Sequence, residues 1–267
     1  METSSNLISV AIPTFNSSKY LEDCLKSLSY ISIVDEIIIS DDCSNDDEFA
    51  IIKNIIRGYE NNFEIKVFRN KKNIGAFKNK FENIKRCKND IVYQIDSDNI
   101  ACKNLSKVID YILKENNNNF LYLPSKIYQF RKYPKTVKFL SLFNKKFQVT
   151  YTNTNFIFSK EVIKNAISKN FKVTVDKNIN WVLNSGNFIV HKSKYINLFE
   201  KLVTEDIRYP MDAVAISYYW LLNGGELKTL KAFKHYHRKR YDSVSFIESQ
   251  GSYESLMRFR EKLLQIN

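Results

Sequence analysis

The sequence predicts an α/β fold in which a mainly parallel central sheet carries helices on both faces. Short runs rich in Ile and Val alternate with segments whose apolar residues recur at helical spacing. Three of the apolar runs end in polar sequences, and open α/β sheets bind their ligands at such strand ends. The chain has 267 residues, 44% hydrophobic and 26% charged, which is ordinary for a globular protein with one large core.

The first half of the chain alternates between predicted strands and predicted helices. Leu7 to Ile12 is an apolar run that ends at the turn residues Pro13 to Asn16, and Ser17 or Ser18 then supplies the N-cap of a helix. Further strands are expected at Val34 to Ser40, Glu64 to Phe68, Ile91 to Ile95 and Phe120 to Leu123. Further helices are expected near Phe49 to Ile56, Ala76 to Arg86 and Leu105 to Ile112. This alternation implies a parallel sheet covered on both faces.

The alternation breaks after Leu123, so we divide the chain into residues 1–124 and 125–267, two halves of one continuous domain. Strands of the second half are expected within Val149 to Ser159, at Asn187 to His191 and at Glu226 to Leu230. Its helices are expected at Ser159 to Ile167, Asp212 to Leu222 and Tyr253 to Ile266.

Composition narrows the compartment and the partners. The net charge of +12 favours a negatively charged partner such as a nucleotide diphosphate, a nucleic acid or an anionic membrane, without choosing among them. The four cysteines show no zinc-site or disulfide spacing, which favours a reducing compartment. Leu7 to Ile12 is too short for a signal sequence, and no apolar stretch approaches the roughly 18 residues of a membrane span. We therefore expect a cytoplasmic protein, at most peripheral to a membrane.

Three polar sequences follow three predicted strands: Pro13 to Asn16, Asp41 to Asp47, and Asp96 to Asn99. Parallel strands place their carboxyl ends along one edge of the sheet, so these residues should converge on one crevice. Taken alone, Asp96-Ser97-Asp98 favours a solvated turn over a metal site, because Asp, Ser and Asn are ordinary turn residues.

Together the motifs resemble the family 2 glycosyltransferases of the GT-A fold, inverting enzymes that use nucleotide-activated sugars. The matching segments are Ile8 to Asn16 with Tyr20, Leu21 and Leu25, then Glu36 to Asp46, Asn73 to Gly75 with Lys80, and Asp96 to Asp98 in the Asp-x-Asp position. They cover about the first 100 residues in the family's order. Beyond them the likeness thins to Ser185 to Phe188, Asp212 to Glu226, His235 to Arg238 and Ser243 to Ser245. The resemblance implies that residues 1–124 bind the nucleotide-sugar and residues 125–267 bind the acceptor.

The resemblance also implies a divalent cation, Mn²⁺ or Mg²⁺, that stabilises the nucleoside diphosphate leaving group. Asp98 is the expected direct ligand, and Asp96 would hold the ribose or reach the metal through water. His237, or His235 if the register differs by two, would complete the coordination from the C-terminal segment. The alternative is a pair of partly exposed histidines that bind no metal.

The remaining expected nucleotide contacts come from the first three motifs. Asp42 is placed to accept a hydrogen bond from the uracil N–H, beside Thr14 and the backbone of Pro13, which favours a UDP-sugar. Asn16, Ser97 and Lys80 complete this group, although the family's usual Ala-Arg-Asn is here Asn79-Lys80-Phe81. Asp41 and Asp46 are expected to shape the turn and cap the next helix instead.

Inversion needs one base that takes the acceptor's proton. The resemblance places it at Asp212, at the start of a predicted helix, with Asp206 of the Glu205-Asp206 pair as a rival. A purely structural explanation for Asp212 is that an acid near a helix N-terminus is favoured by the macrodipole.

We therefore expect a metal-dependent inverting glycosyltransferase that moves a sugar from a UDP-sugar to a hydroxyl of a glycan, a lipid-linked sugar or a protein. One alternative is a nucleotidyltransferase of related fold, against which stands the lack of a glycine-rich phosphate loop near the first strand. Another is a nucleic-acid-binding protein that uses the basic, aromatic segment Lys126 to Lys146. We prefer to assign that segment to the acceptor site or to a dock on an anionic membrane, and we do not expect nucleic acid as a partner.

Overall fold

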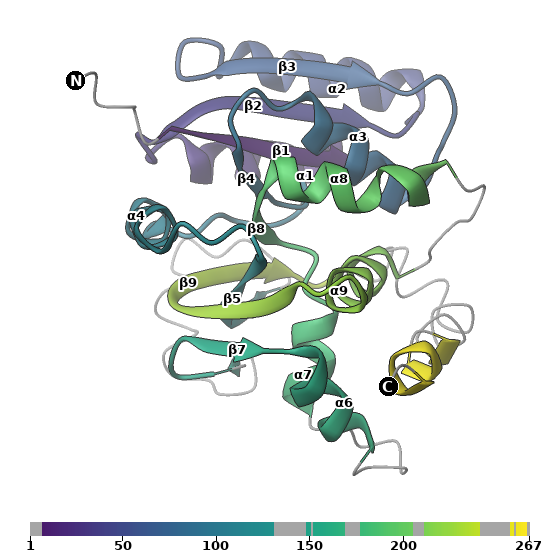
Figure 1. Ribbon diagram of the computed structural model, residues 1–267. Coiled ribbons are helices and arrows are strands. Elements are labelled where there is room, and N and C mark those ends of the chain that lie inside the picture. The colour runs from purple at the N-terminus through teal and green to yellow at the C-terminus, as the bar shows by residue number, and fades with distance from the viewer. Residues whose placement is uncertain are drawn as a thin grey trace.

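A computed structural model describes residues 7–130, 148–150, 152–168, 177–204, 211–240, 257–258 and 260–265. The described chain is organised around one nine-stranded sheet in the order β3-β2-β1-β4-β8-β5-β9-β7, with β6 paired to β5 (Figure 1). The strands are β1 Ile8–Thr14, β2 Val34–Asp41, β3 Glu64–Arg69, β4 Ile91–Gln94, β5 Phe120–Phe130, β6 Gln148–Thr150, β7 Phe156–Phe158, β8 Phe188–His191 and β9 Glu226–Arg238.

The helices follow the same order along the chain. They are α1 Ser18–Leu28, α2 Asp46–Arg57, α3 Ala76–Arg86, α4 Leu105–Glu115, α6 Lys160–Ser168, α7 Lys177–Leu183, α8 Lys192–Val203 and α9 Asp212–Leu222, and helical residues also occur within 257–265. None of these described helices is long and apolar enough to cross a membrane.

The sheet is mainly parallel, as the sequence predicts. Strands β3, β2, β1 and β4 pair in parallel, and so do β5 and β9. Strand β8 runs antiparallel to both β4 and β5, which leaves those two strands pointing the same way. The exceptions to the common direction are therefore β8, β6 and β7.

Residues of each central strand alternate between two hydrophobic cores, one on each face of the sheet. In β1, Val10 and Ile12 belong to the core shared with α1, α2 and α4, whereas Ala11 belongs to the core shared with α3, α8 and α9. In β8, Ile189 faces the first core and Val190 the second. This alternation is the period-two pattern of a strand with both faces buried, so the expectation of helices on both faces is confirmed.

The second half departs most from the expected elements. Strand β5 runs to Phe130 instead of ending at Leu123, and β9 runs to Arg238 instead of ending at Leu230. Helices α7 and α8 were not expected. The two long strands pair in parallel up to Phe130 opposite Arg238, and this ladder lengthens both beyond what their local composition predicts.

The sheet crosses the predicted boundary between the halves. Strand β5 contains residue 124, and β8 from the second half lies between β4 and β5. The functional division into 1–124 and 125–267 stays a prediction. Residues 131–147 and 205–210 lie outside the described residues, and with them most of the Lys126 to Lys146 segment.

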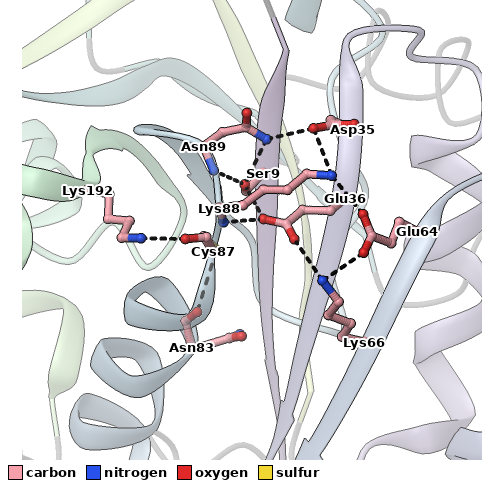
Figure 2. A network of polar contacts seen from close by, with 10 residues as sticks. All are labelled: Ser9, Asp35, Glu36, Glu64, Lys66, Asn83, Cys87, Lys88, Asn89 and Lys192. Carbon is pink, nitrogen blue, oxygen red and sulfur yellow. Dashed lines mark hydrogen bonds and ion pairs between the residues drawn. The ribbon is translucent and has the colours of Figure 1, made fainter.

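A polar network ties the sheet together near the amino ends of β1 and β2 (Figure 2). Its centre is Glu36, fully buried in β2, which accepts hydrogen bonds from the Ser9 hydroxyl at 2.6 Å and from the backbone N–H of Lys88. Ser9 Oγ in turn accepts from the backbone N–H of Asn89 at 3.0 Å. This end of the sheet is opposite the polar strand ends, and its buried carboxylate fixes how β4 enters the sheet.

Replacing Glu36 by Ala should destabilise the fold, because the Ser9 hydroxyl and the Lys88 N–H lose their buried acceptor. We expect the free energy of unfolding, measured by urea titration, to fall by about 2–4 kcal/mol. Glu64 is the matched control, since it pairs with both Lys66 and Lys88 at 2.7 Å but lies at the exposed edge. Glu64→Ala should cost far less, and equal losses for the two variants would contradict this role of Glu36.

Candidate active site

The three polar strand ends meet at one edge of the sheet. The backbone N–H of Asp42 donates to the carbonyl of Thr14 at 2.9 Å. The hydroxyl of Ser17 lies 2.9 Å from that of Thr14 and 2.8 Å from that of Ser97, and all three side chains are buried. Ser17 is the N-cap residue of α1, as expected, but its side chain makes no capping bond because it connects β1 to the Asp-x-Asp segment. The predicted convergence is confirmed.

Asp42 holds the loop between β3 and α3. Its Oδ1 accepts from Asn70 Nδ2 at 2.9 Å and from the N–H of Ile74 at 2.8 Å, and its Oδ2 accepts from the N–H of Gly75 at 2.9 Å. Gly75 has a φ of 88°, a conformation that favours glycine. A carboxylate has about four acceptor sites, and these three contacts occupy most of those of Asp42.

Asp41 shapes the turn after β2, as its sequence suggests. The expectation that Asp41 and Asp46 cap the next helix is wrong, because the cap of α2 is Asn45, whose side chain accepts from the N–H of Glu48, and Asp46 pairs with Arg69. The Asp41 carboxylate accepts from the hydroxyl and the N–H of Ser44, at 2.5 and 3.1 Å. Ser44 Oγ accepts from the N–H of Asn16, whose φ of 45° places it at a tight turn beside this carboxylate. Pro13, buried in β1 opposite Ser40, is the other predicted residue of this corner.

Lys80 of α3 lies at the centre of the site. Its ammonium is 2.9 Å from Asp96 Oδ1 and 2.6 Å from Asp212 Oδ2, and it also donates to the carbonyl of Gly186 at 3.3 Å. The lysine side chain is only 5% exposed. One buried cation thus joins the acid that follows β4, the acid that begins α9 and the chain that leads into β8.

Burial and charge oppose one another in this cluster. Burial lowers the pKa of Lys80, but the charges of Asp212 and Asp96 outweigh it and hold that pKa well above its ordinary value. Burial raises the pKa of Asp96 to about 6, and although Lys80 opposes this shift, Asp212 and Asp98 reinforce it. Among the described residues Asp212 Oδ2 has no hydrogen-bond donor other than the Lys80 ammonium, 2.6 Å away.

Asn187 connects Asp96 to the C-terminal segment. Its Oδ1 accepts from the N–H of Asp96 at 2.7 Å, and its amide nitrogen lies 2.8 Å from His235 Nε2. Burial holds the pKa of His235 well below its ordinary value, so the ring is neutral and Nε2 accepts from the amide. In this arrangement the Nε2 of His235, the rival metal ligand, is occupied by Asn187.

Gly186 is required by the close approach of Asp96. A Cβ at this position would lie 2.8 Å from Asp96 Oδ2 and 3.4 Å from Lys80 Nζ. Any side chain here would therefore displace the carboxylate.

Asp98, the expected metal ligand, faces the end of β9. Its Oδ2 pairs with Arg240 Nη1 at 3.2 Å, and its backbone carbonyl accepts from Arg238 Nε at 3.0 Å. Burial lowers the pKa of the His237 imidazole below its ordinary value, and the nearby charge of Asp98 opposes this shift only in part. A neutral imidazole and a carboxylate therefore lie on the same side of the site.

The donors present fit a cation that is held partly by substrate. No group of three or more His, Cys, Asp or Glu within the described part of the chain lies close enough to hold a metal alone. Mg²⁺ and comparable hard cations commonly take only one or two carboxylates from the protein and complete their shell with phosphate oxygens and water. Asp98 with the neutral His237 suits that mode, which requires the diphosphate to be present.

The sequence missed several residues of the site. Asn187 and Arg240 contact the Asp-x-Asp segment directly, and Ser17 was expected only as a helix cap. The sequence did point to Asn187, because the Ser185 to Phe188 segment resembles the family. It did not show that Asn187 meets Asp96 and His235, which lie far away in sequence. Asp206 and Ser243 to Ser245 lie outside the described residues.

The sheet and its flanking helices have the GT-A fold. A model of the family described as glycosyl transferase family 2 matches residues 9–174, more than half of the chain. The chain belongs to glycosyl transferase family 2.

Curated relatives include the poly(ribitol-phosphate) beta-N-acetylglucosaminyltransferase TarS from the Mu50 and MW2 strains of Staphylococcus aureus. Each is 28% identical to this chain over 133 residues, which are 48% of this chain and 22% of TarS. The match thus spans about a fifth of the length of these curated relatives.

Solved structures show the same fold over nearly the whole chain. S. aureus TarS residues 1–349 in complex with UDP-GlcNAc has a TM-score of 0.63 at 19% identity, covering 97% of this chain and 70% of that one. GalNAc-T7 with UDP, GalNAc and Mn²⁺ also has a TM-score of 0.63, at 14% identity, covering 97% of this chain and 48% of that one. At such identities the likeness shows the GT-A fold alone.

The raised pKa of Asp96 predicts that its ionised carboxylate lowers the free energy of unfolding, by an amount that depends on pH. Its pKa is about 6 in the folded protein against an ordinary 3.8, so charging it opposes folding fully above about pH 6 and not at all below about pH 4. The side chain is 32% exposed, which reduces the cost. Asp96→Asn, in which Lys80 keeps Asp212, should raise the free energy of unfolding by about 1 kcal/mol at pH ~7.5 and leave it unchanged at pH ~4. A gain of equal size at both pH values would contradict the shift.

Proposed function

We propose that the chain is a metal-dependent inverting glycosyltransferase that moves a sugar from a UDP-sugar to a hydroxyl of a glycan, a lipid-linked sugar or a protein. The observation that carries the proposal is the cluster in which Lys80 joins Asp96, of the Asp-x-Asp segment, to Asp212 at 2.9 and 2.6 Å. A candidate base thereby lies beside a candidate donor site in a family whose members transfer sugars.

The chemistry assigns one step to each group. Asp212 takes the proton of the acceptor hydroxyl while that oxygen attacks the anomeric carbon, and the bond from this carbon to the diphosphate oxygen breaks on the opposite face. Lys80 holds the Asp212 carboxylate in place for this proton transfer. A divalent cation, when bound, would neutralise charge on the departing diphosphate, with Asp98 and His237 as its protein ligands and Asp96 on the ribose side.

Observations on the nucleotide and acceptor sides favour a UDP-sugar and an anionic acceptor. Asp42 retains one acceptor site beside Thr14, where a uracil N–H can bond, and Asn16, Ser97 and the backbone of Pro13 line the same edge. The TarS and GalNAc-T7 structures contain UDP or a UDP-sugar, which makes UDP-GlcNAc and UDP-GalNAc the first donors to test. The net charge of +12 suits a phosphate-rich acceptor of the kind named in TarS, poly(ribitol-phosphate).

The donor and the metal are tested together by thermal shift and by hydrolysis of a panel of nucleotide-sugars, with and without Mn²⁺. We expect one or two UDP-sugars to stabilise the protein, and only when Mn²⁺ is present. Asp98→Asn should abolish the Mn²⁺-dependent part of this shift and lower transfer by at least about 100-fold. Unchanged transfer and unchanged Mn²⁺-dependent UDP binding in Asp98→Asn would remove the metal role.

The base is tested by Asp212→Asn, which keeps the shape of the side chain and removes its basicity. We expect kcat to fall about 10²- to 10⁴-fold while the dissociation constant for the UDP-sugar changes by less than about threefold. Asp206→Asn is the comparison variant and should keep its turnover. If the two variants exchange these outcomes, the base is Asp206. Inversion itself is checked by the anomeric configuration of the product in NMR spectra.

A further inference from the structure

Two arginines at the end of β9 share one aromatic ring. The guanidinium of Arg238 lies 4.7 Å from the centroid of the Tyr20 ring, and that of Arg240 lies 4.8 Å from the same centroid. Tyr20 belongs to the first turn of α1, which begins at the predicted nucleotide edge. The ring is therefore a platform for cations beside the Asp-x-Asp segment.

Arg238 is fixed to the body of the protein. Its guanidinium pairs with Asp23 at 2.7 Å and donates to the backbone carbonyl of Asp98 at 3.0 Å. Its backbone N–H donates to Asn99 Oδ1 at 3.0 Å. Its guanidinium also lies 4.8 Å from the ring centroid of Phe130. These contacts explain Arg238 as a structural clamp that seats the end of β9 against the segment after β4.

Arg240 differs because its ion-pair partner is a side chain assigned to the reaction. Its Nη1 lies 3.2 Å from Oδ2 of Asp98, and the two side chains are only 12% and 16% exposed. A cation that took Asp98 as its ligand would place its charge beside this guanidinium. Repulsion between the two would be strong in a partly buried site, so the guanidinium and the metal compete for the same carboxylate.

We propose that Arg240 exchanges partners during donor binding: it neutralises Asp98 in the donor-free enzyme, and it moves to the diphosphate of the nucleotide-sugar when the metal takes Asp98. This proposal rests on the metal role of Asp98 in the proposed function. A guanidinium suits both partners, since its planar fork bonds carboxylate and phosphate oxygens equally well. The guanidinium lies on the face of Tyr20 while it pairs with Asp98.

The exchange keeps the charge of Asp98 and of the groups that face it balanced in both states. Without donor, Arg240 cancels the charge of Asp98. With donor, the cation and Arg240 together cancel Asp98 and the two phosphates of the diphosphate. The metal therefore binds weakly until a diphosphate is present to receive the displaced arginine, and this couples metal binding to donor binding.

The test measures Mn²⁺ binding to the donor-free protein by EPR or calorimetry, and then UDP binding at saturating Mn²⁺. Arg240→Gln should bind Mn²⁺ about 5- to 10-fold more tightly than the wild type, because the competitor is gone, and should bind UDP about 10-fold more weakly. Lys231→Gln is the matched control, because it removes the same charge from an exposed side chain of β9, and both affinities should stay within about twofold of the wild type. Arg240→Lys should bind Mn²⁺ like the wild type and UDP with intermediate affinity. Thermal melts of each variant confirm folding.

The outcomes separate this inference from the proposed function. If Asp98→Asn abolishes Mn²⁺ binding while Arg240→Gln leaves the Mn²⁺ affinity unchanged or weaker, the metal site stands and the competition is refuted. If Arg240→Gln binds UDP as tightly as Lys231→Gln does, the transfer to the diphosphate is refuted. If neither the wild type nor Arg240→Gln binds Mn²⁺ with or without UDP, the metal role and the exchange both fall.

Discussion

The buried ammonium of Lys80 is the interaction on which the rest of the site depends. It lies 2.9 Å from Asp96 and 2.6 Å from Asp212, two acids that follow β4 and begin α9. Without this cation two carboxylates would face one another in a poorly solvated space, at a cost of several kcal/mol. Because α3, β4 and α9 come from both halves of the chain, one charge joins the expected donor side to the expected acceptor side.

Strand β8 explains how the second half reaches this centre. It lies antiparallel between β4 and β5, and its entry brings the carbonyl of Gly186 and the amide of Asn187 to Lys80 and Asp96. The absence of a side chain at Gly186 leaves room for the Asp96 carboxylate. The Asn187 amide also bonds to His235, which links this segment to β9. Polar contacts through Asn187 thus fix the backbone of the Asp-x-Asp segment, while its two carboxylates pair with Lys80 and Arg240.

Each acid of this segment is paired with a basic side chain, Asp96 with Lys80 and Asp98 with Arg240. The two bases lie on different kinds of element: Lys80 belongs to helix α3 and also contacts Asp212 and the Gly186 carbonyl, whereas Arg240 follows the last residue of β9 and lies on the Tyr20 ring. A base held within a helix suits a permanent support, and a base on the segment after a strand suits an exchange of partners. Lys80 and Arg240 thus show one use of the protein's positive charge, which is to neutralise these two acids.

The sequence by itself determined the layered α/β architecture and the convergence of three polar strand ends, because apolar periodicity and strand-end chemistry are local properties. Helices α3 and α9 match their expected bounds for the same reason. Only the tertiary structure decided that Lys80 joins Asp96 to Asp212. It also decided that Asn187 hydrogen-bonds to His235 and that Arg240 pairs with Asp98. These contacts join residues 16 to 142 positions apart, and no local pattern encodes which distant partner a side chain meets. The lengths of β5 and β9 were likewise set by their mutual pairing, since how far a strand continues depends on the length of the partner strand beside it.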